Sequence, residues 1–172
     1  MVNVLVIGGS RGIGAEVVRQ AVMAGHKVRA LSRSGRLPNG LPSTCEAIAG
    51  NALNRDDVNK ALEGVDVVVQ ALGIVLSPKM PFEPVSLFSD ATKILVPAME
   101  EMKISRLISV TGFGAGDSKE VISIFQKLPF HLAFRHPYGD KSIQEDIIEN
   151  SNLDWLIVRP GVLTNGRSSG RY

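Results

Sequence analysis

The chain has 172 residues, of which 44% are hydrophobic and 21% are charged, and its formal net charge is +2 at pH 7. These values are ordinary for a globular protein with one hydrophobic core. They exclude a disordered or strongly basic chain, and no interleaving of basic and aromatic residues predicts a nucleic-acid partner.

Nothing in the sequence predicts a membrane or secreted location. The longest apolar stretch, residues 65–76, contains Asp66 and Gln70 and is far shorter than the ~20 residues of a membrane span. Met1 stands too close to the first apolar run to leave room for a signal peptide. The single cysteine, Cys45, allows no internal disulfide. We therefore expect a cytoplasmic protein with no membrane association, in which Cys45 is a core residue.

The chain opens with an apolar run and a glycine-rich turn. Residues 4–7, VLVI, are too few for a helix and rich in β-branched side chains, which predicts a buried parallel strand. An apolar stripe at helical spacing follows the turn and ends at Gly25, and residues 27–31 read as a second strand. This is the setting in which closely spaced glycines indicate dinucleotide binding. The glycines are Gly8, Gly9, Gly12 and Gly14.

Such a turn has a physical reason. One glycine allows the bend, a second lets a pyrophosphate approach the backbone, and a third lets helix and strand pack closely. The N–H groups at the start of the helix then receive the phosphate charge. The alternative is a glycine turn with a structural role alone.

The end of the second strand predicts the choice of cofactor. An acidic residue there would bind a ribose 2′-hydroxyl, whereas an arginine favours a 2′-phosphate. Arg33 and Ser34 occupy this position, and Arg11 lies in the glycine turn. The sequence therefore favours NADP over NAD, unless both arginines are only solvated surface residues.

The middle of the chain continues the alternation. We expect strands at 45–49 and 66–71, and between them a helix capped by Asn54 and closed by Gly64. A proline-rich loop covers 77–84, and a helix kinked at Pro97 spans about 86–102. Its expected apolar face consists of Phe88, Ala91, Leu95, Ala98 and Met102.

The last third adds two strands, at 106–110 and 153–158. Between them we expect an amphipathic segment, 118–134, broken by Pro129, and then a helix that begins at Pro137 and runs through Asn150. Its buried residues would be Ile143, Ile147 and Ile148.

The predicted fold is α/β: a Rossmann-type doubly wound parallel sheet of order 3-2-1-4-5-6 with helices on both faces, in a single domain spanning 1–172. Ligands of such sheets bind at the carboxyl ends of the strands. We expect substrate loops at about 74–85 and 112–136.

Five short stretches carry a family resemblance: GGSRGIG at 8–14, GNA at 50–52, GVDVV at 64–68, RLISVT at 106–111 and DWLIVRPG at 154–161. In this order they resemble the short-chain dehydrogenase/reductase superfamily. The likeness is greatest to its small atypical NAD(P)-binding branch, of the flavin reductase/biliverdin-IXβ reductase type.

The resemblance implies where NADP would lie, with NADPH preferred over NADH. The glycine turn would hold the pyrophosphate, Asn51 would lie beside the adenine, and the segment after Pro160 beside the nicotinamide. The full set of implied cofactor residues is Gly8, Gly9, Ser10, Arg11, Gly12, Ile13, Gly14, Arg33, Ser34, Asn51, Ala52, Ala71, Leu72, Gly73, Thr111, Lys141, Pro160, Gly161, Val162 and Leu163.

The implied catalytic residues depart from the family pattern. Active members have a Tyr four residues before a Lys. Lys141 stands where the Lys is expected, but the residue four places earlier is Pro137, and Tyr138 is one place late. Positions i and i+3 of a helix still share a face. The candidates are therefore Thr111, Tyr138 and Lys141, with no metal ligand. Alternatively, Tyr138 only packs on the helix and Lys141 is solvated or binds the ribose.

Two functions follow. The first is an NADPH-dependent oxidoreductase that transfers hydride to a small, planar acceptor such as a flavin or quinone; enzymes of the flavin reductase type take their protons from solvent. The second is a catalytically weak or inactive NADP-binding sensor. A sugar-nucleotide epimerase is disfavoured, because such enzymes carry a sizeable substrate domain. We expect a small-molecule substrate and a monomer or homodimer, with Met99 and Met102 able to face a partner.

Overall fold

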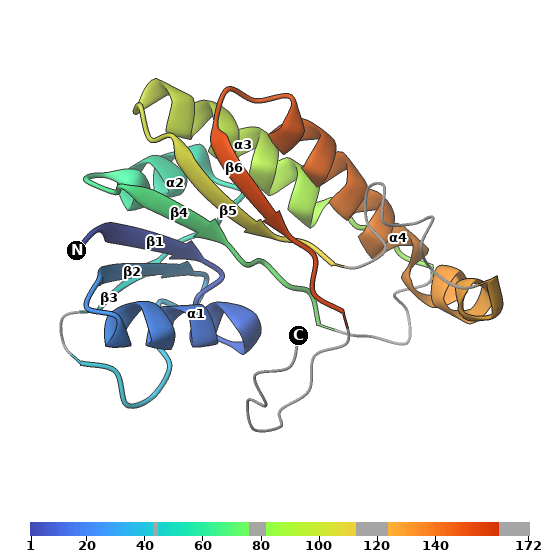
Figure 1. Cartoon of the computed structure of the whole chain (residues 1–172), viewed down its shortest axis with the longest axis horizontal. Coiled ribbons are helices and arrows are strands. Elements are labelled where there is room, and N and C mark those ends of the chain that lie inside the picture. The colour runs from blue at the N-terminus through green and yellow to red at the C-terminus, as the bar shows by residue number, and fades with distance from the viewer. Residues whose placement is uncertain (43–44, 76–81, 113–123, 162–172) are drawn as a thin grey trace.

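A computed structural model describes residues 1–42, 45–75, 82–112 and 124–161; over 124–135 it describes the course of the helix but not the side chains. Within these ranges, parallel strands form one sheet of order β3-β2-β1-β4-β5-β6 (Figure 1). The strands are β1 (Asn3–Ile7), β2 (Lys27–Ser32), β3 (Glu46–Ala49), β4 (Val67–Gln70), β5 (Arg106–Val110) and β6 (Asp154–Val158). The predicted fold class and strand order are confirmed.

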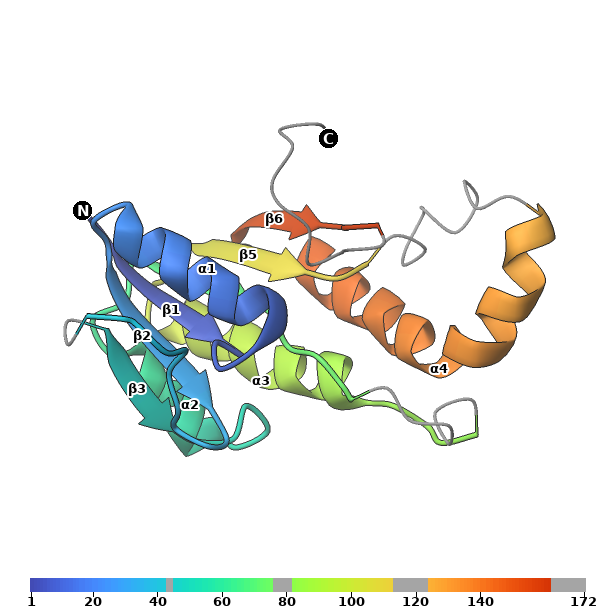
Figure 2. The same cartoon turned by 90° about the horizontal axis from the view of Figure 1, so that it is seen from below.

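The helices cover both faces of this sheet, as predicted. Helix α1 (Gly12–Met23) lies on one face, and α2 (Arg55–Leu62), α3 (Leu87–Glu101) and α4 (Ile124–Glu149) lie on the other (Figure 2). None of the helices in the described part of the chain is both long and apolar enough to cross a bilayer.

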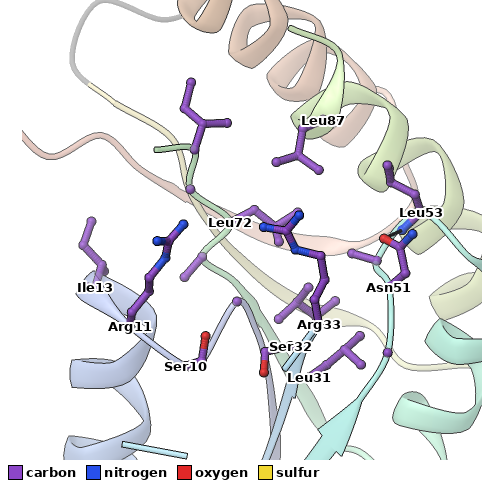
Figure 3. A pocket seen from close by; sticks show the side chains of 18 residues that line it. Ser10, Arg11, Ile13, Leu31, Ser32, Arg33, Asn51, Leu53, Leu72 and Leu87 are labelled. Carbon is purple, nitrogen blue, oxygen red and sulfur yellow. Dashed lines mark hydrogen bonds between the residues drawn. The ribbon is translucent and has the colours of Figure 1, made fainter. Parts of the chain in front are cut away.

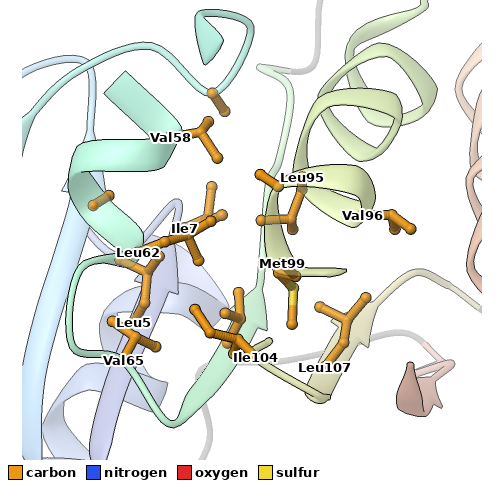
Figure 4. Packing of buried hydrophobic residues seen from close by; sticks show 14 of the residues in the cluster. Leu5, Ile7, Val58, Leu62, Val65, Leu95, Val96, Met99, Ile104 and Leu107 are labelled. Carbon is orange, nitrogen blue, oxygen red and sulfur yellow. The ribbon is translucent and has the colours of Figure 1, made fainter. Parts of the chain in front are cut away.

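Alternation along the strands creates two apolar cores. In β1, Leu5 and Ile7 point toward α2 and α3, where they join the larger cluster with Leu62, Leu95 and Leu107 (Figure 4). Val4 and Val6 point to the opposite face and pack beneath α1 in the smaller cluster. Because successive strand side chains alternate between the faces, one β1 sequence serves both layers. Cys45 is 5% exposed and belongs to the smaller cluster, so its predicted place in the core is confirmed.

The glycine turn brings backbone against backbone. Gly8 has a φ of +89°, and a Cβ placed on it would stand 2.6 Å from the carbonyl oxygen of Ala71. A Cβ on Gly14 would stand 2.3 Å from the carbonyl oxygen of Gly8. No side chain fits in either gap. The first turn of α1 therefore lies directly on the end of β1, and β1 lies directly beside the chain leaving β4.

The region before β6 differs from the prediction. Instead of a broken segment followed by a helix starting at Pro137, α4 is one helix that passes through both Pro129 and Pro137. A proline removes one backbone hydrogen bond and bends a helix, but it does not always end one. Figure 2 shows this bend between the first turns of α4 and its longer second part.

Two predicted helix faces were wrong at one residue each. Ile143 is 49% exposed, whereas Gln144 and Glu145 are each 1% exposed. On α3, the predicted apolar residues Phe88, Ala91, Leu95 and Ala98 are buried, but Met102, directly after the helix, is 38% exposed. Met99 is fully buried, so it cannot face a partner molecule. Ile147 is half-buried and Ile148 fully buried, as expected.

We predict that Gly14→Ala lowers the free energy of unfolding by about 1–3 kcal/mol, because the new methyl group overlaps the Gly8 carbonyl. Gly139→Ala is the control: beyond its own helix backbone, no described atom lies within 4 Å of its added Cβ, and alanine favours the helix by about 0.5–1 kcal/mol. Urea denaturation measures both. Equal stability of Gly14→Ala and wild type would contradict the close contact.

Candidate functional site

A cavity of about 500 Å³ opens at the carboxyl ends of β1, β2 and β4 (Figure 3). The parallel register brings these ends together, since Ile7 lies beside Leu31 of β2 and Gln70 of β4. The cavity is lined by Ile7, Gly8, Ser10, Arg11, Gly12, Ile13, Leu31, Ser32, Arg33, Gly50, Asn51, Ala52, Leu53, Ala71, Leu72, Gly73, Ile74 and Leu87.

Most residues predicted for the phosphate and adenosine end lie in this lining. Gly9 and Gly14 do not: both are buried, and a Cβ on Gly9 would stand 2.9 Å from the Cβ of Ala30. Ser34 also lies outside the lining, and its neighbour Ser32 takes part instead. Sequence reasoning missed Ser32 and the apolar residues Ile7, Leu31, Leu53, Ile74 and Leu87, although several of them end predicted strands.

The start of α1 presents unpaired backbone donors to the cavity. Arg11 precedes the helix with no side-chain cap, and the first turn contains no acidic residue. The first intrahelical bond runs from the Ala15 N–H to the Arg11 carbonyl, so the N–H groups of residues 12–14 precede it. A Cβ on Gly12 would meet no atom within 4 Å. This helix end can therefore receive an anion at close range.

The cavity carries positive charge. Arg11 and Arg33 are exposed, and their side chains extend toward the same region of the cavity (Figure 3). The described residues that line it include no aspartate or glutamate. Among the residues that the structure describes, none forms an ion pair with either arginine. Both guanidinium groups are therefore available to an anionic ligand.

The turn that carries Asn51 is held by its own hydrogen bonds. The Asn51 N–H donates to Oδ2 of Asp57 at 2.7 Å, and the Leu53 N–H donates to Oδ1 of Asn51 at 3.0 Å. Asn54 caps α2 as predicted, because its Oδ1 accepts from the Asp57 N–H at 3.0 Å. The Asn51 oxygen already accepts one hydrogen bond and can accept one more, and its amide nitrogen can donate to a ligand.

The three predicted catalytic residues meet elsewhere, at the end of β5. The Lys141 ammonium donates to the Thr111 carbonyl oxygen. A Cβ on Gly112 would stand 3.1 Å from the Tyr138 hydroxyl oxygen, so the Tyr138 ring lies against the residue after Thr111. None of the three lines the cavity. The order of the sheet places them beyond β4, on the side of the cavity away from Arg33.

A buried carboxylate that sequence reasoning missed organises this second region. Glu145 is 1% exposed, and its Oε1 accepts a hydrogen bond from the Thr111 hydroxyl. Arg159, directly after β6, donates to Glu145 through Nε at 3.1 Å and through Nη2 at 2.9 Å. The signal in the sequence was the spacing, because Lys141 and Glu145 are four residues apart on one helix face.

Burial and charge shift the titration of two groups here. Burial lowers the pKa of Lys141 to about 8, while the negative charge of Glu145 acts in the opposite direction. The Lys141 Nζ also lies 4.9 Å from the centroid of the Phe88 ring. Burial raises the pKa of Tyr138 above its ordinary value. Tyr138 is therefore a phenol at neutral pH.

Further polar contacts fix α4 to its neighbours. Asp140, 4% exposed, accepts hydrogen bonds from the N–H groups of Phe88 at 2.7 Å and Ser89 at 3.2 Å, which caps α3. One turn later, Gln144 donates to Gln70 at 2.9 Å and to Ser109 at 3.0 Å. Tyr138 and Lys141 thus project from a helix anchored to α3, β4 and β5.

Part of the predicted site cannot be placed. Pro160 is half-buried and Gly161 exposed, and neither lines the cavity. Val162, Leu163 and most of the predicted substrate loops lie outside the described residues. In the described part of the chain, no cluster of His, Cys, Asp and Glu is arranged to hold a metal ion.

Comparison with known proteins identifies the class of protein that this fold and cavity define. Residues 8–172 match the model of the NAD(P)H-binding family, so the chain belongs to that family. Its Rossmann fold and its relatives make it a member of an oxidoreductase family related to the short-chain dehydrogenases/reductases, as the sequence motifs indicated.

Three relatives show the range of this family. The chain is 37% identical to the Photosystem II assembly factor Ycf39 of Synechocystis sp. over 158 residues, 91% of this chain and 44% of the relative. It is 24% identical to a 3-beta-hydroxysteroid dehydrogenase of Mycolicibacterium neoaurum over 161 residues, 87% of this chain and 43% of the relative. The chain thus spans less than half the length of these two relatives. The structure of ChuY, an anaerobillin reductase from Escherichia coli O157:H7, matches with a TM-score of 0.75 at 25% identity, covering 98% of this chain and 77% of that one.

We predict that Lys141 makes the protein more stable as pH rises. Its pKa is about 8 in the folded chain against an ordinary 10.5, so between these values the unfolded chain binds a proton that the folded chain has lost. The free energy of unfolding therefore increases with pH across this window. Relative to Lys141→Gln, wild type should gain on the order of 1–2 kcal/mol between pH 7 and pH 9.5. Urea titrations of both proteins at the two pH values measure this gain. A constant difference would contradict the burial of the ammonium.

Proposed function

We propose that the protein is an NADPH-dependent oxidoreductase that transfers hydride to a small, planar acceptor such as a flavin or quinone. The observation that carries the proposal is the cavity at the end of β1, where two arginines and no carboxylate accompany the open start of α1. The family binds NAD(P)H, and this chain retains a cradle that fits it.

The charges of the cavity support NADPH over NADH. The pyrophosphate would rest on the N–H groups before Ala15, with Gly12 leaving room for its oxygens. The 2′-phosphate would lie between Arg11 and Arg33, each able to form charge-assisted hydrogen bonds with it. No acidic residue in the lining offers an acceptor to a ribose 2′-hydroxyl.

The strand order supports a path for the rest of the cofactor. Ala71, at the end of β4, lines the cavity, and β4 pairs with β5, whose end carries Thr111. A dinucleotide lying across the strand ends would therefore extend from the arginines toward Thr111, with Pro160 and the segment after it beside the nicotinamide. Bound NADPH supplies the hydride; the chain binds it, orients it and presents hydrogen-bond donors.

The polar groups at the end of β5 suit a reduction. Tyr138 remains a phenol, and Lys141 carries N–H donors beyond the one bonded to Thr111. The Thr111 hydroxyl donates to Glu145, so it can only accept from a ligand. An acceptor that takes its protons from solvent requires positioning more than an acid from the protein. The names of two relatives, a dehydrogenase and an anaerobillin reductase, agree with redox chemistry.

A second candidate is an NADP-binding protein with a regulatory or assembly role. Two observations favour it: Tyr138 is displaced by one residue from the family spacing, and the relative with 37% identity is named an assembly factor. This candidate shares the cavity and differs only in turnover.

Mixing purified protein with NADPH and a panel of flavin, quinone and tetrapyrrole acceptors separates the two. The oxidoreductase should consume NADPH, followed by its absorbance, with at least one acceptor. Tight NADPH binding by calorimetry with no consumption on any acceptor would favour the regulatory role. No heat of binding for either nicotinamide cofactor would overturn both.

We predict that Arg33→Gln weakens NADPH binding by about 1–3 kcal/mol, or about 5- to 150-fold in Kd, through loss of a charge-assisted contact with the 2′-phosphate. NADH binding should change little, because NADH lacks that phosphate. Arg36→Gln is the matched control, since Arg36 is exposed on the same loop but does not line the cavity. Equal NADPH affinity for wild type and Arg33→Gln, measured by titration calorimetry, would show that Arg33 does not contact the phosphate.

A further inference from the structure

We propose that Glu145 is a positioning residue for the reactive end of the site: its buried carboxylate turns the Thr111 hydroxyl inward and, one helical turn from Lys141, acts as the counter-charge of that ammonium. Lys141, rather than Thr111, then presents hydrogen to the ligand. The use of this arrangement in hydride transfer rests on the proposed function, but the arrangement itself does not.

The contacts of Glu145 support this role, because they join α4 to the ends of β5 and β6. Glu145 projects from α4, accepts a hydrogen bond from the Thr111 hydroxyl at the end of β5, and forms an ion pair with Arg159 after β6. Lys141, one helical turn before Glu145, donates to the carbonyl oxygen of the same Thr111. The hydroxyl and the carbonyl oxygen of Thr111 are thus both bonded to α4, while its N–H donates to the carbonyl oxygen of Val158.

The charges around Lys141 single out Glu145. On α4, Tyr138 is neutral, and Asp140 is occupied by the N–H groups at the start of α3. Among the described residues, Lys141 contacts the Phe88 ring of α3 and the Thr111 carbonyl oxygen after β5, and the charged side chain after β6 is Arg159, which bonds Glu145. Burial disfavours the ammonium, and Glu145 is the group that raises the pKa of Lys141 against it.

A buried carboxylate bonded so fully is costly to remove for structural reasons alone. A charge at 1% exposure requires partners, and Glu145 has Arg159 and Thr111. A purely structural role would affect stability and leave the titration of Lys141 unchanged. The test therefore reads the titration of Lys141 directly.

Cofactor-free protein is acetylated with trace acetic anhydride from pH 6.5 to 10, and the acetylated Lys141 peptide is quantified by mass spectrometry. The pH at which the acetylation rate of Lys141 is half its maximum gives the titration midpoint of Lys141. Wild type should show a midpoint near 8. Glu145→Gln should lower it by about one unit, and acetylation at pH 7 should become about fivefold faster, because the stabilising negative charge is lost. Glu145→Asp keeps the negative charge, so the titration midpoint of Lys141 should stay close to the wild-type value.

Glu149→Gln is the matched control. Glu149 lies one turn further along α4, its side chain is 44% exposed, and its carboxylate lies 3.7 Å from Arg159. In the described structure it bonds neither Thr111 nor Lys141. The titration midpoint of Lys141 in this variant should equal that in wild type. A wild-type midpoint in folded Glu145→Gln, or an equal shift in Glu149→Gln, would overturn the proposal.

If circular dichroism shows that Glu145→Gln does not fold, the variant Arg159→Gln tests the proposal instead. It leaves Glu145 with less positive charge around it, so the midpoint of Lys141 should rise; an unchanged or lower midpoint would overturn the proposal. Because no cofactor is present, these outcomes are independent of turnover. Failure to oxidise NADPH would overturn the proposed function and leave the role of Glu145 in the Lys141 titration intact.

Discussion

The contact on which the rest of the structure depends is the one between the first turn of α1 and the end of β1. With no Cβ at Gly14 or Gly8, the helix backbone rests on the strand backbone, and the strand rests against Ala71 after β4. Three chain segments therefore converge with no side chains between them. Where Gly8 and Gly12 line the cavity, the lining is backbone, and the N–H groups at the start of α1 lie beside it. A ligand with a diffuse negative charge is what such a surface recognises.

Around this floor, the site handles charge in two different ways. Arg11 and Arg33 are exposed and lack ion-pair partners among the described residues, so they are ready to exchange water for a phosphate. At the end of β5 the charges are already satisfied, because Glu145 is paired with Arg159 inside the protein. Exposed arginines suit a ligand that binds and leaves, whereas a buried and fully bonded pair suits a fixed scaffold. Under the proposed function, recognition of the cofactor and presentation of the reactive groups would thus be separated along the strand order.

The sequence was sufficient wherever local chemistry dictates structure. Short β-branched runs predicted the strands, Asn54 predicted the start of α2, and the glycines predicted the bend. Prediction from the sequence failed where a contact between distant parts of the chain determines the structure. Pro137 is a poor helix residue by itself, yet it is buried inside α4, whose side chains bond α3, β4 and β5. Glu145 was not singled out by the sequence, because its contacts with Thr111 and Arg159 form only in the folded chain. Leu87 joined the cavity without any local pattern, since only the packing of α3 places it there.

The continuity of α4 also changes the meaning of the displaced tyrosine. Had a helix begun at Pro137, Tyr138 would lie in a terminal turn with a poorly fixed ring. Within a continuous helix, positions i and i+3 lie on one face, and both side chains reach the end of β5: Lys141 bonds Thr111, and Tyr138 lies against Gly112. The irregular spacing therefore does not separate the two groups. What their surroundings change is their protonation, because burial keeps Tyr138 a phenol while Glu145 favours the ammonium of Lys141. Two hydrogen-bond donors at one strand end can polarise an acceptor during its reduction. They are less suited to removing a proton from an alcohol during its oxidation.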